Sequence, residues 1–171
     1  MRVLLLMALI VLSACQEDDA EIPGPAALTE ETLSHFCRMQ VIDHGGPKAQ
    51  IHLEGYSYPI FFAQVRDGLA FLKGPEKFAP VVAIYVSDMG TAPSWENPGA
   101  DNWIDARDAF FVVGARVTGG MGAPEVTPFL TRDAASAFAA TKGGTIMTLE
   151  QIPDEAVLSP VEISLPGKDA S

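Results

Sequence analysis

The sequence predicts a mixed α and β fold (α/β or α+β) made of two similar halves, each in the order strand, strand, helix, strand. Two observations predict it: apolar runs of strand length alternate with single stretches of helical period, and glycine or proline separates them. The pairs Arg66-Asp67 and Arg132-Asp133 open the two expected helices at equivalent positions. With 48% hydrophobic residues, a chain of 171 residues can bury a core of ordinary size.

The first half is expected to contain two strands, a helix and a third strand. Residues 49–53 alternate between apolar and polar side chains, and residues 58–63 form a second apolar run. Helical spacing of apolar residues covers 65–72 and stops at Gly74. Residues 81–86 are apolar and rich in β-branched side chains, which predicts a central strand.

The second half repeats this order. Thr131 is a good N-cap residue, and the glycines that follow Lys142 are typical of a helix end, so both limits of the helix are marked. The expected elements are strands at 109–117 and 126–130, a helix at 132–141 and a strand at 145–151. Residues 88–101, between the halves, contain several glycines and prolines, which predicts a long connecting loop. Loops of this length are often functional.

The N-terminus predicts export and lipid attachment. Arg2 is followed by an apolar run too short to span a bilayer, which is typical of a signal peptide. Leu-Ser-Ala-Cys at 12–15 resembles the lipobox of bacterial lipoproteins, in which the cysteine, here Cys15, is acylated and becomes the mature N-terminus. An ordinary signal peptide cut near Ala14 is the alternative. Gln16 after an acylated cysteine favours the outer membrane over the inner membrane, on the periplasmic side of the envelope.

The chain is therefore divided into segments by composition and pattern. They are a signal peptide at 1–14, a lipid-anchored flexible tether at 15–28, a first half at 29–90, a connecting loop at 91–102, a second half at 103–165 and a disordered tail at 166–171.

The charge and the absence of familiar motifs exclude several function classes. A net charge of −11 should repel nucleic acid and anionic lipid headgroups, so we expect no nucleic-acid partner and membrane contact through the lipid alone. The sequence has no Gly-x-Ser-x-Gly, no paired-histidine zinc motif and no glycine-rich phosphate loop, which argues against hydrolytic chemistry.

Cys37 and Met39 are the first candidate metal ligands. With Cys15 acylated, Cys37 is the one thiol left in the mature chain, and an unpaired thiol in an oxidising compartment is a hazard unless it has a role. In an extended segment, residues two apart project on the same face, so both sulfurs could approach one ion. Thiolate and thioether donors favour Cu(I). The alternative is that Cys37 is a small buried hydrophobe and Met39 fills core space.

Met121 and His44 are further candidates. Met121 stands among glycines, which can present its flexible side chain at a loop tip as a third, distant ligand; an ordinary turn with an incidental methionine is the alternative. His44 lies in the turn at 43–47 and could be an auxiliary copper ligand, or it could only organise that turn.

Several stretches of the chain, in order, resemble the NosL family of copper-binding accessory lipoproteins associated with nitrous oxide reductase. The family often has glycine where Arg38 stands and proline where Gly120 stands. The stretches are Phe36-Cys37-Arg38-Met39, Asp43-His44-Gly45-Gly46-Pro47-Lys48-Ala49-Gln50-Ile51, Trp103-Ile104-Asp105-Ala106-Arg107, Met121-Gly122-Ala123-Pro124-Glu125-Val126-Thr127-Pro128-Phe129, and Ala137-Phe138 followed by Gly143-Gly144.

This resemblance implies a monomeric Cu(I) carrier that is not an enzyme and that delivers copper toward the copper-sulfide centre of nitrous oxide reductase. Its partner would be the membrane transporter complex for maturation of that reductase, or the reductase itself. It also implies a fold related in shape to organomercurial lyase, with Cys37, Met39 and Met121 as metal ligands and no catalytic residues.

Two other functions remain open at this point. One is a thiol-dependent enzyme, an oxidoreductase or organomercurial-lyase-like protein acting through Cys37, although such chemistry usually uses a second thiol. The other is a structural lipoprotein adaptor that binds no metal.

Overall fold

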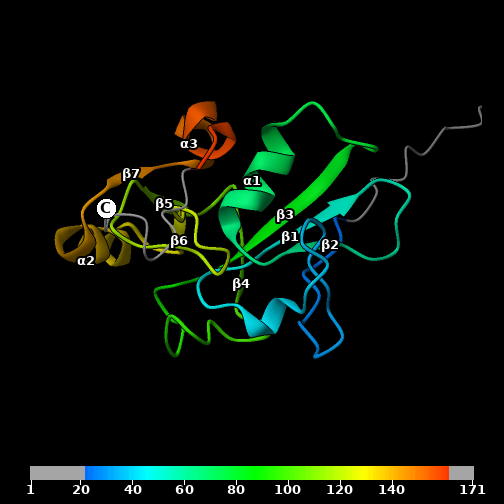
Figure 1. The fold of residues 1–171 in the computed structure, drawn as a ribbon, viewed down its shortest axis with the longest axis horizontal. Helices are drawn as coiled ribbons and strands as arrows, with labels where there is room; N and C mark the ends of the chain where they lie inside the picture. The colour runs from blue at the N-terminus through cyan, green and yellow to red at the C-terminus, as the bar shows by residue number, and fades with distance from the viewer. Residues whose placement is uncertain (1–21, 162–171) are drawn as a thin grey trace, which may run out of the picture.

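The computed structural model describes residues 22–161, which form two antiparallel sheets with three α-helices (Figure 1). The predicted signal peptide, Cys15 and the tail at 166–171 lie outside the described residues. The elements are η1 (Val41–Asp43), β1 (Ala49–Leu53), β2 (Ile60–Phe62), α1 (Val65–Lys73), β3 (Val81–Ser87), β4 (Trp103–Asp105), β5 (Phe110–Val113), β6 (Thr127–Phe129), α2 (Arg132–Lys142), β7 (Thr145–Met147), η2 (Leu149–Gln151) and α3 (Asp154–Leu158), where η marks a short 3₁₀ helix.

The two sheets repeat one topology. The first has the strand order β2-β1-β3-β4 and the second has the order β6-β5-β7, and every neighbouring pair is antiparallel. In the first sheet β1 lies between β2 and β3, and in the second sheet β5 lies between β6 and β7. In both units the helix stands in the sequence between the second and the third of these strands. The mixed α+β fold and the order strand, strand, helix, strand are thereby confirmed.

Helix α1 covers one face of the first sheet (Figure 1). Its buried residues include Val65 and Leu69, one turn apart, which belong to the same apolar core as Ile51 of β1. Gly68 allows the close approach, because a Cβ added there would lie 2.6 Å from the Cβ of Ala49.

The opposite face of β1 is covered by the N-terminal segment 22–28. The Gln50 side chain accepts the Ala26 N–H at 2.8 Å and donates to the Ala26 carbonyl at 2.9 Å. The Tyr85 hydroxyl donates to the Pro23 carbonyl at 2.8 Å. Residues 22–28 fall within the segment assigned to the flexible tether, and these contacts hold them on the body.

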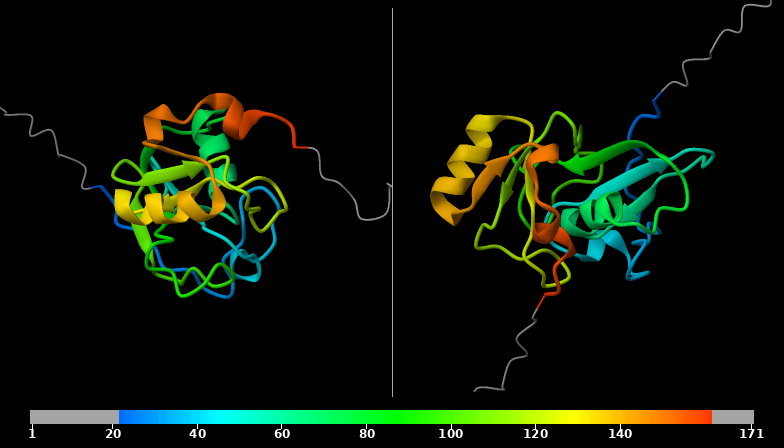
Figure 2. Two further views of the ribbon diagram at one scale, coloured as in Figure 1. Left: turned by 90° about the vertical axis from the view of Figure 1, so that its left-hand side faces the viewer. Right: turned by 90° about the horizontal axis from the view of Figure 1, so that it is seen from above.

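The second sheet separates two apolar clusters. Phe111 of β5 belongs to the core that it shares with the first sheet, and its neighbour Val112 belongs to a cluster beneath α2. Thr131 caps α2 as expected, because its side chain accepts the Ala134 N–H at 3.2 Å. Figure 2 shows α2 on the outer side of this sheet, with the first sheet and α1 on the other side.

The structure differs from the sequence expectations in the second half. Strand β4 falls within the range 103–165 but pairs with β3, so it completes the first sheet. Strand β7 ends at Met147, since Thr148 and Gln151 form a capping box that starts η2 in place of the expected strand continuation. Strand β5 stops at Val113, before Gly114 with φ +76°, and α3, which packs on α1, was not expected. Among residues 22–161, none of the helices combines the length and the hydrophobicity that a membrane span requires.

Candidate metal site

Cys37 lies in a tight turn, which an isolated antiparallel bridge closes. Inside the turn, the Ser34 N–H donates to the Met39 carbonyl at 2.8 Å. Arg38, between the two candidate ligands, has φ +60°, a left-handed conformation that favours glycine. The segment is therefore not extended, and the condition under which residues two apart share one face is not met here, because the chain turns between Cys37 and Met39.

The sulfur-bearing side chains of this turn lie at the surface. Cys37 is a partly buried free thiol, and Met39 is 51% exposed. Met39 does not fill core space. A half-exposed thioether and a partly exposed thiol in one turn are each able to contact an ion that arrives from solvent or from another protein.

The Cys37 turn is fixed against the end of β2. The His35 N–H donates to the Phe61 carbonyl at 2.6 Å, and the Ala63 N–H donates to Oγ of Ser34 at 3.4 Å. The imidazole of His35 packs among phenylalanine rings, and burial lowers its pKa. These rings, at centroid distances of 5.5 to 5.9 Å, are Phe36, Phe62, Phe71 and Phe78.

Met121 lies in a closed loop that the first half of the chain contacts. Within the loop, the Gly119 N–H donates to the Ala123 carbonyl at 2.8 Å, and Gly122 has φ +79°. The Met121 N–H donates to Oε1 of Gln64 at 3.3 Å. Met121 is partly buried, so it sits in a loop as expected but lies against the protein and does not project freely.

The two stretches that carry the candidate ligands meet at the junction between β2 and α1. The Cys37 turn bonds to Ala63 through Ser34, and the Met121 loop bonds to Gln64, the next residue. Segments that are far apart in the sequence are thus attached to consecutive backbone positions.

His44 also contacts the Met121 loop. It directly follows η1, and its Nδ1 lies 3.2 Å from the Gly120 carbonyl. Because a carbonyl only accepts, Nδ1 carries the proton in this contact, and Nε2 of the neutral ring is left with a lone pair. Nε2 is buried without a hydrogen-bond partner among the described residues. A Cβ at Gly120 would overlap the His44 side chain, so glycine allows the loop to approach this closely.

Lys48 holds the His44 turn against the β2–α1 junction. Its side chain is buried, and Nζ donates to the His44 carbonyl, to the Gly45 carbonyl at 3.1 Å and to the Ala63 carbonyl at 3.1 Å. Burial lowers the pKa of Lys48 to about 8. The ammonium therefore provides a hydrogen-bond donor for carbonyls of the His44 turn and of the β2–α1 junction, in place of the partners that a strand or helix would supply.

Glu125 lies beneath the Met121 loop. Its Oε1 accepts the Arg66 N–H at 2.9 Å and the Val126 N–H at 2.8 Å, while Oε2 is buried without a partner among the described residues. Burial raises the pKa of Glu125 to about 8. Nearby, Nε2 of Gln64 donates to Oδ1 of Asp67 at 2.9 Å, and burial raises the pKa of Asp67.

These three supporting residues were not singled out from the sequence. Lys48 and Glu125 stand in the stretches that carry the family resemblance, which was their one signal, and Gln64 had none. Within residues 22–161 no group of three or more His, Cys, Asp or Glu side chains could hold a metal ion.

The comparison with known families decides the identity of the chain. The sequence model of the NosL family matches residues 25–157. The chain belongs to the NosL family. It is 53% identical over 161 residues to the copper-binding lipoprotein NosL of Achromobacter cycloclastes, covering 94% of this chain and 83% of that protein. It is 33% identical over 135 residues to the protein of the same name from Stutzerimonas stutzeri, covering 78% of this chain and 68% of the relative.

Solved NosL structures share the fold. The crystal structure of the copper chaperone NosL from Shewanella denitrificans matches with a TM-score of 0.71 at 32% identity, covering 75% of this chain and 95% of that one. The solution structure of apo-NosL from Achromobacter cycloclastes matches with a TM-score of 0.51 at 52% identity, covering 68% and 94%. The two curated relatives and the crystal structure carry copper in their names, and none of the names is that of an enzyme.

Proposed function

We propose that this NosL protein is a copper chaperone that binds one Cu(I) through Cys37, Met39 and Met121 and delivers it for assembly of the copper-sulfide centre of nitrous oxide reductase. The observation that carries the proposal is the junction at Ala63 and Gln64, to which the Cys37 turn and the Met121 loop are both bonded. Membership in a family whose relatives are named as copper-binding lipoproteins and copper chaperones supports it.

The donor set suits a carrier. The Cys37 thiolate would balance the charge of Cu(I) and supply most of the affinity, and the two thioethers would be weaker, exchangeable donors. A partner could then displace one donor at a time, and Met39 is accessible to it, because that side chain is half exposed. His44 is an auxiliary donor in this scheme, since its contact with Gly120 leaves Nε2 free to coordinate.

The same proposal includes the location and the partners. A lipid on Cys15 would anchor the protein on the periplasmic side of the envelope, at the outer rather than the inner membrane. The protein would act as a monomer without enzymatic activity and would dock on the transporter complex for reductase maturation or on the reductase itself. The lipoprotein relatives support the anchor, and a single thiol in the mature chain argues against thiol-disulfide catalysis.

Competition with a chromogenic Cu(I) chelator, on reduced protein without oxygen, tests the ligand set. Cys37→Ala should lower the Cu(I) affinity by more than about a hundredfold. This loss is larger than the one expected when a residue that only hydrogen-bonds to a metal ligand is removed. Met39→Leu and Met121→Leu should each lower it by about tenfold, because a thioether is a weaker donor. Met147→Leu is the matched control, since Met147 packs against the core. Unchanged affinity in Cys37→Ala would refute the proposal.

A second pair of variants tests whether the junction organises the site. Gln64→Leu removes the acceptor of the Met121 N–H and should weaken Cu(I) binding by about tenfold. Gln50→Leu removes a buried glutamine that holds residue Ala26 on the other face of the first sheet. It should lower stability but leave the affinity unchanged. Equal effects of the two variants on affinity would show that the Gln64 contact has no specific role.

A further inference from the structure

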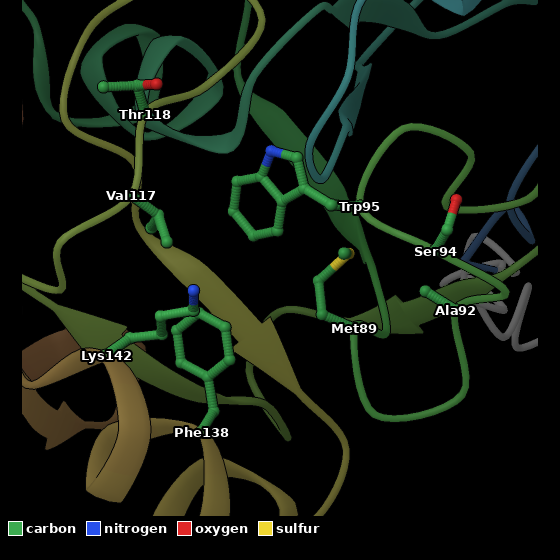
Figure 3. Close-up of a pocket in the computed structure, with 8 residues that line it drawn as sticks. All are labelled: Met89, Ala92, Ser94, Trp95, Val117, Thr118, Phe138 and Lys142. Carbon is green, nitrogen blue, oxygen red and sulfur yellow. The ribbon is translucent and has the colours of Figure 1, made fainter.

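A cavity of about 430 Å³ opens between the loop that follows β3 and the second half of the chain. Met89 and Trp95 come from the loop, Val117 from the segment after β5, and Phe138 and Lys142 from α2 (Figure 3). None of these side chains takes part in the proposed copper site. Small-molecule sites in proteins are typically concave, mostly apolar and of about this volume, roughly 300–1,000 Å³.

Two aromatic rings give the cavity a flat apolar surface. The rings of Trp95 and Phe138 lie within 9° of parallel, with their centroids 6.4 Å apart. Figure 3 shows both rings face-on and displaced sideways from each other, with the sulfur of Met89 next to Trp95. Both aromatic residues are only partly buried, so a planar group could lie across them. Offset stacking and contacts with a thioether favour an aromatic occupant over a saturated one.

A cation stands at the edge of this surface. Lys142 is exposed, and its side chain lines the cavity together with Phe138 (Figure 3). It forms no ion pair with the carboxylates of residues 22–161. Lys142 therefore gives the edge of this aromatic pocket a positive charge, which suits an anionic ligand over a neutral or cationic one. Ser94 and Thr118 also line the cavity and add polar groups to its wall.

We propose that this cavity binds a planar aromatic anion, an arene carboxylate or sulfonate of one or two rings, with its ring on Trp95 and Phe138 and its charge at Lys142. The site goes beyond the proposed copper function, and no part of it requires copper. Because Thr118 directly precedes the Met121 loop, a ligand there would lie beside a support of the copper site.

Titration of the copper-free protein with 2-naphthoate, followed by NMR of its backbone amides and the indole N–H of Trp95, tests the proposal. We expect saturable shifts at Met89, Trp95 and Val117 at submillimolar to millimolar ligand. Neutral 2-naphthalenemethanol should bind about fivefold more weakly, the size of a partly screened ion pair. Cyclohexanecarboxylate, which has the charge without the flat ring, should not saturate the site.

Variants separate the contributions of ring and charge. Lys142→Met should remove the preference for naphthoate over the neutral alcohol, and Phe138→Leu should weaken both aromatic ligands by about tenfold, as the loss of a stacking contact does. Both substitutions introduce an apolar side chain of similar length to the original one. The dispersion of the NMR spectrum reports whether each variant is folded.

A second cavity in the first half is the internal control. It has about 440 Å³ and is also lined by a lysine and an aromatic ring, Lys77 and Phe78. The ammonium of Lys77, however, donates to the carbonyls of Leu72 and Gly74. Shifts confined to that cavity, equal binding of cyclohexanecarboxylate, or no saturable shift at Trp95 would each overturn the proposal.

Discussion

Replacing Glu125 with glutamine tests whether the carboxyl beneath the Met121 loop is neutral in the folded protein. Its Oε1 accepts the N–H groups of Arg66 and Val126, and its Oε2 is buried without a partner among the described residues. Glutamine has nearly the same shape, can keep both contacts through its own oxygen and carries no charge. Glu125→Gln should therefore reproduce the protonated form of the wild-type side chain at every pH.

The expected magnitude follows from the pKa of Glu125, which burial raises from 4.5 to about 8. The folded protein holds this proton more tightly than the unfolded chain, so the contribution of Glu125 to wild-type stability is greatest at low pH and falls as the pH rises toward the folded pKa. Between about pH 5 and about pH 8 the loss is on the order of 3 kcal/mol, from about 1.36 kcal/mol per pKa unit. The variant has no such loss.

Urea unfolding of both proteins across this pH range measures the difference in the free energy of unfolding. His35 and His52, whose pKa values burial lowers, occur in both proteins, so their contributions cancel. We expect the two proteins to agree within about 1 kcal/mol near pH 5 and the variant to be more stable by about 3 kcal/mol near pH 8. A difference that stays constant with pH would refute the reasoning.

Two further substitutions test the support of the site and the packing of the first half. Lys48→Met should lower the free energy of unfolding by about 3 kcal/mol, because it leaves buried carbonyls unpaired at roughly 1 kcal/mol or more each; an unchanged urea midpoint would contradict this. Gly68→Ala should lower it by about 1–3 kcal/mol, because the new Cβ would lie 2.6 Å from that of Ala49. Gly24→Ala is the matched control, since no atom lies within 4 Å of a Cβ there, and equal losses in both alanine variants would exclude the packing explanation.

The elements predicted well from the sequence are those whose limits have local causes. Helix α2 begins after a threonine whose side chain caps it and ends at Gly143 with φ +76°, so both signals act within a few residues. Strand β4 has three residues and pairs with β3 across the connecting loop, so its existence depends on tertiary structure that no local pattern contains. The relation in shape to organomercurial lyase stays a prediction.

The site shows the same division between local and tertiary causes. Cys37, Met39 and Met121 could be selected because soft donors are rare and their chemistry depends on residue type alone. Lys48 and Gln64 could not be selected, because their role depends on which carbonyl and amide groups the folded chain brings to them. The sequence also left the backbone of the Cys37 segment open, and the structure shows a turn that closes through a bond between Ser34 and Met39.

The attachment of the two stretches suggests which proposed ligand leaves first when copper is handed over. The Cys37 turn is bonded through the backbone of His35 to β2, a strand of the first sheet. The Met121 loop contacts the first half through one bond from its own N–H to Gln64 and one from His44 to Gly120, and it keeps its internal closure if both break. The loop can thus withdraw as a unit while the thiol stays in place.

Amide hydrogen exchange tests this order of release. In the copper-free protein the Met121 N–H should exchange faster than the His35 N–H, since local opening of the loop breaks fewer contacts than detaching the turn from the sheet. Cu(I) should then slow exchange at Met121 far more than at His35, because coordination would close the more mobile element. If copper protects both amides equally, the two stretches open together, and Met121 is not the first ligand to leave.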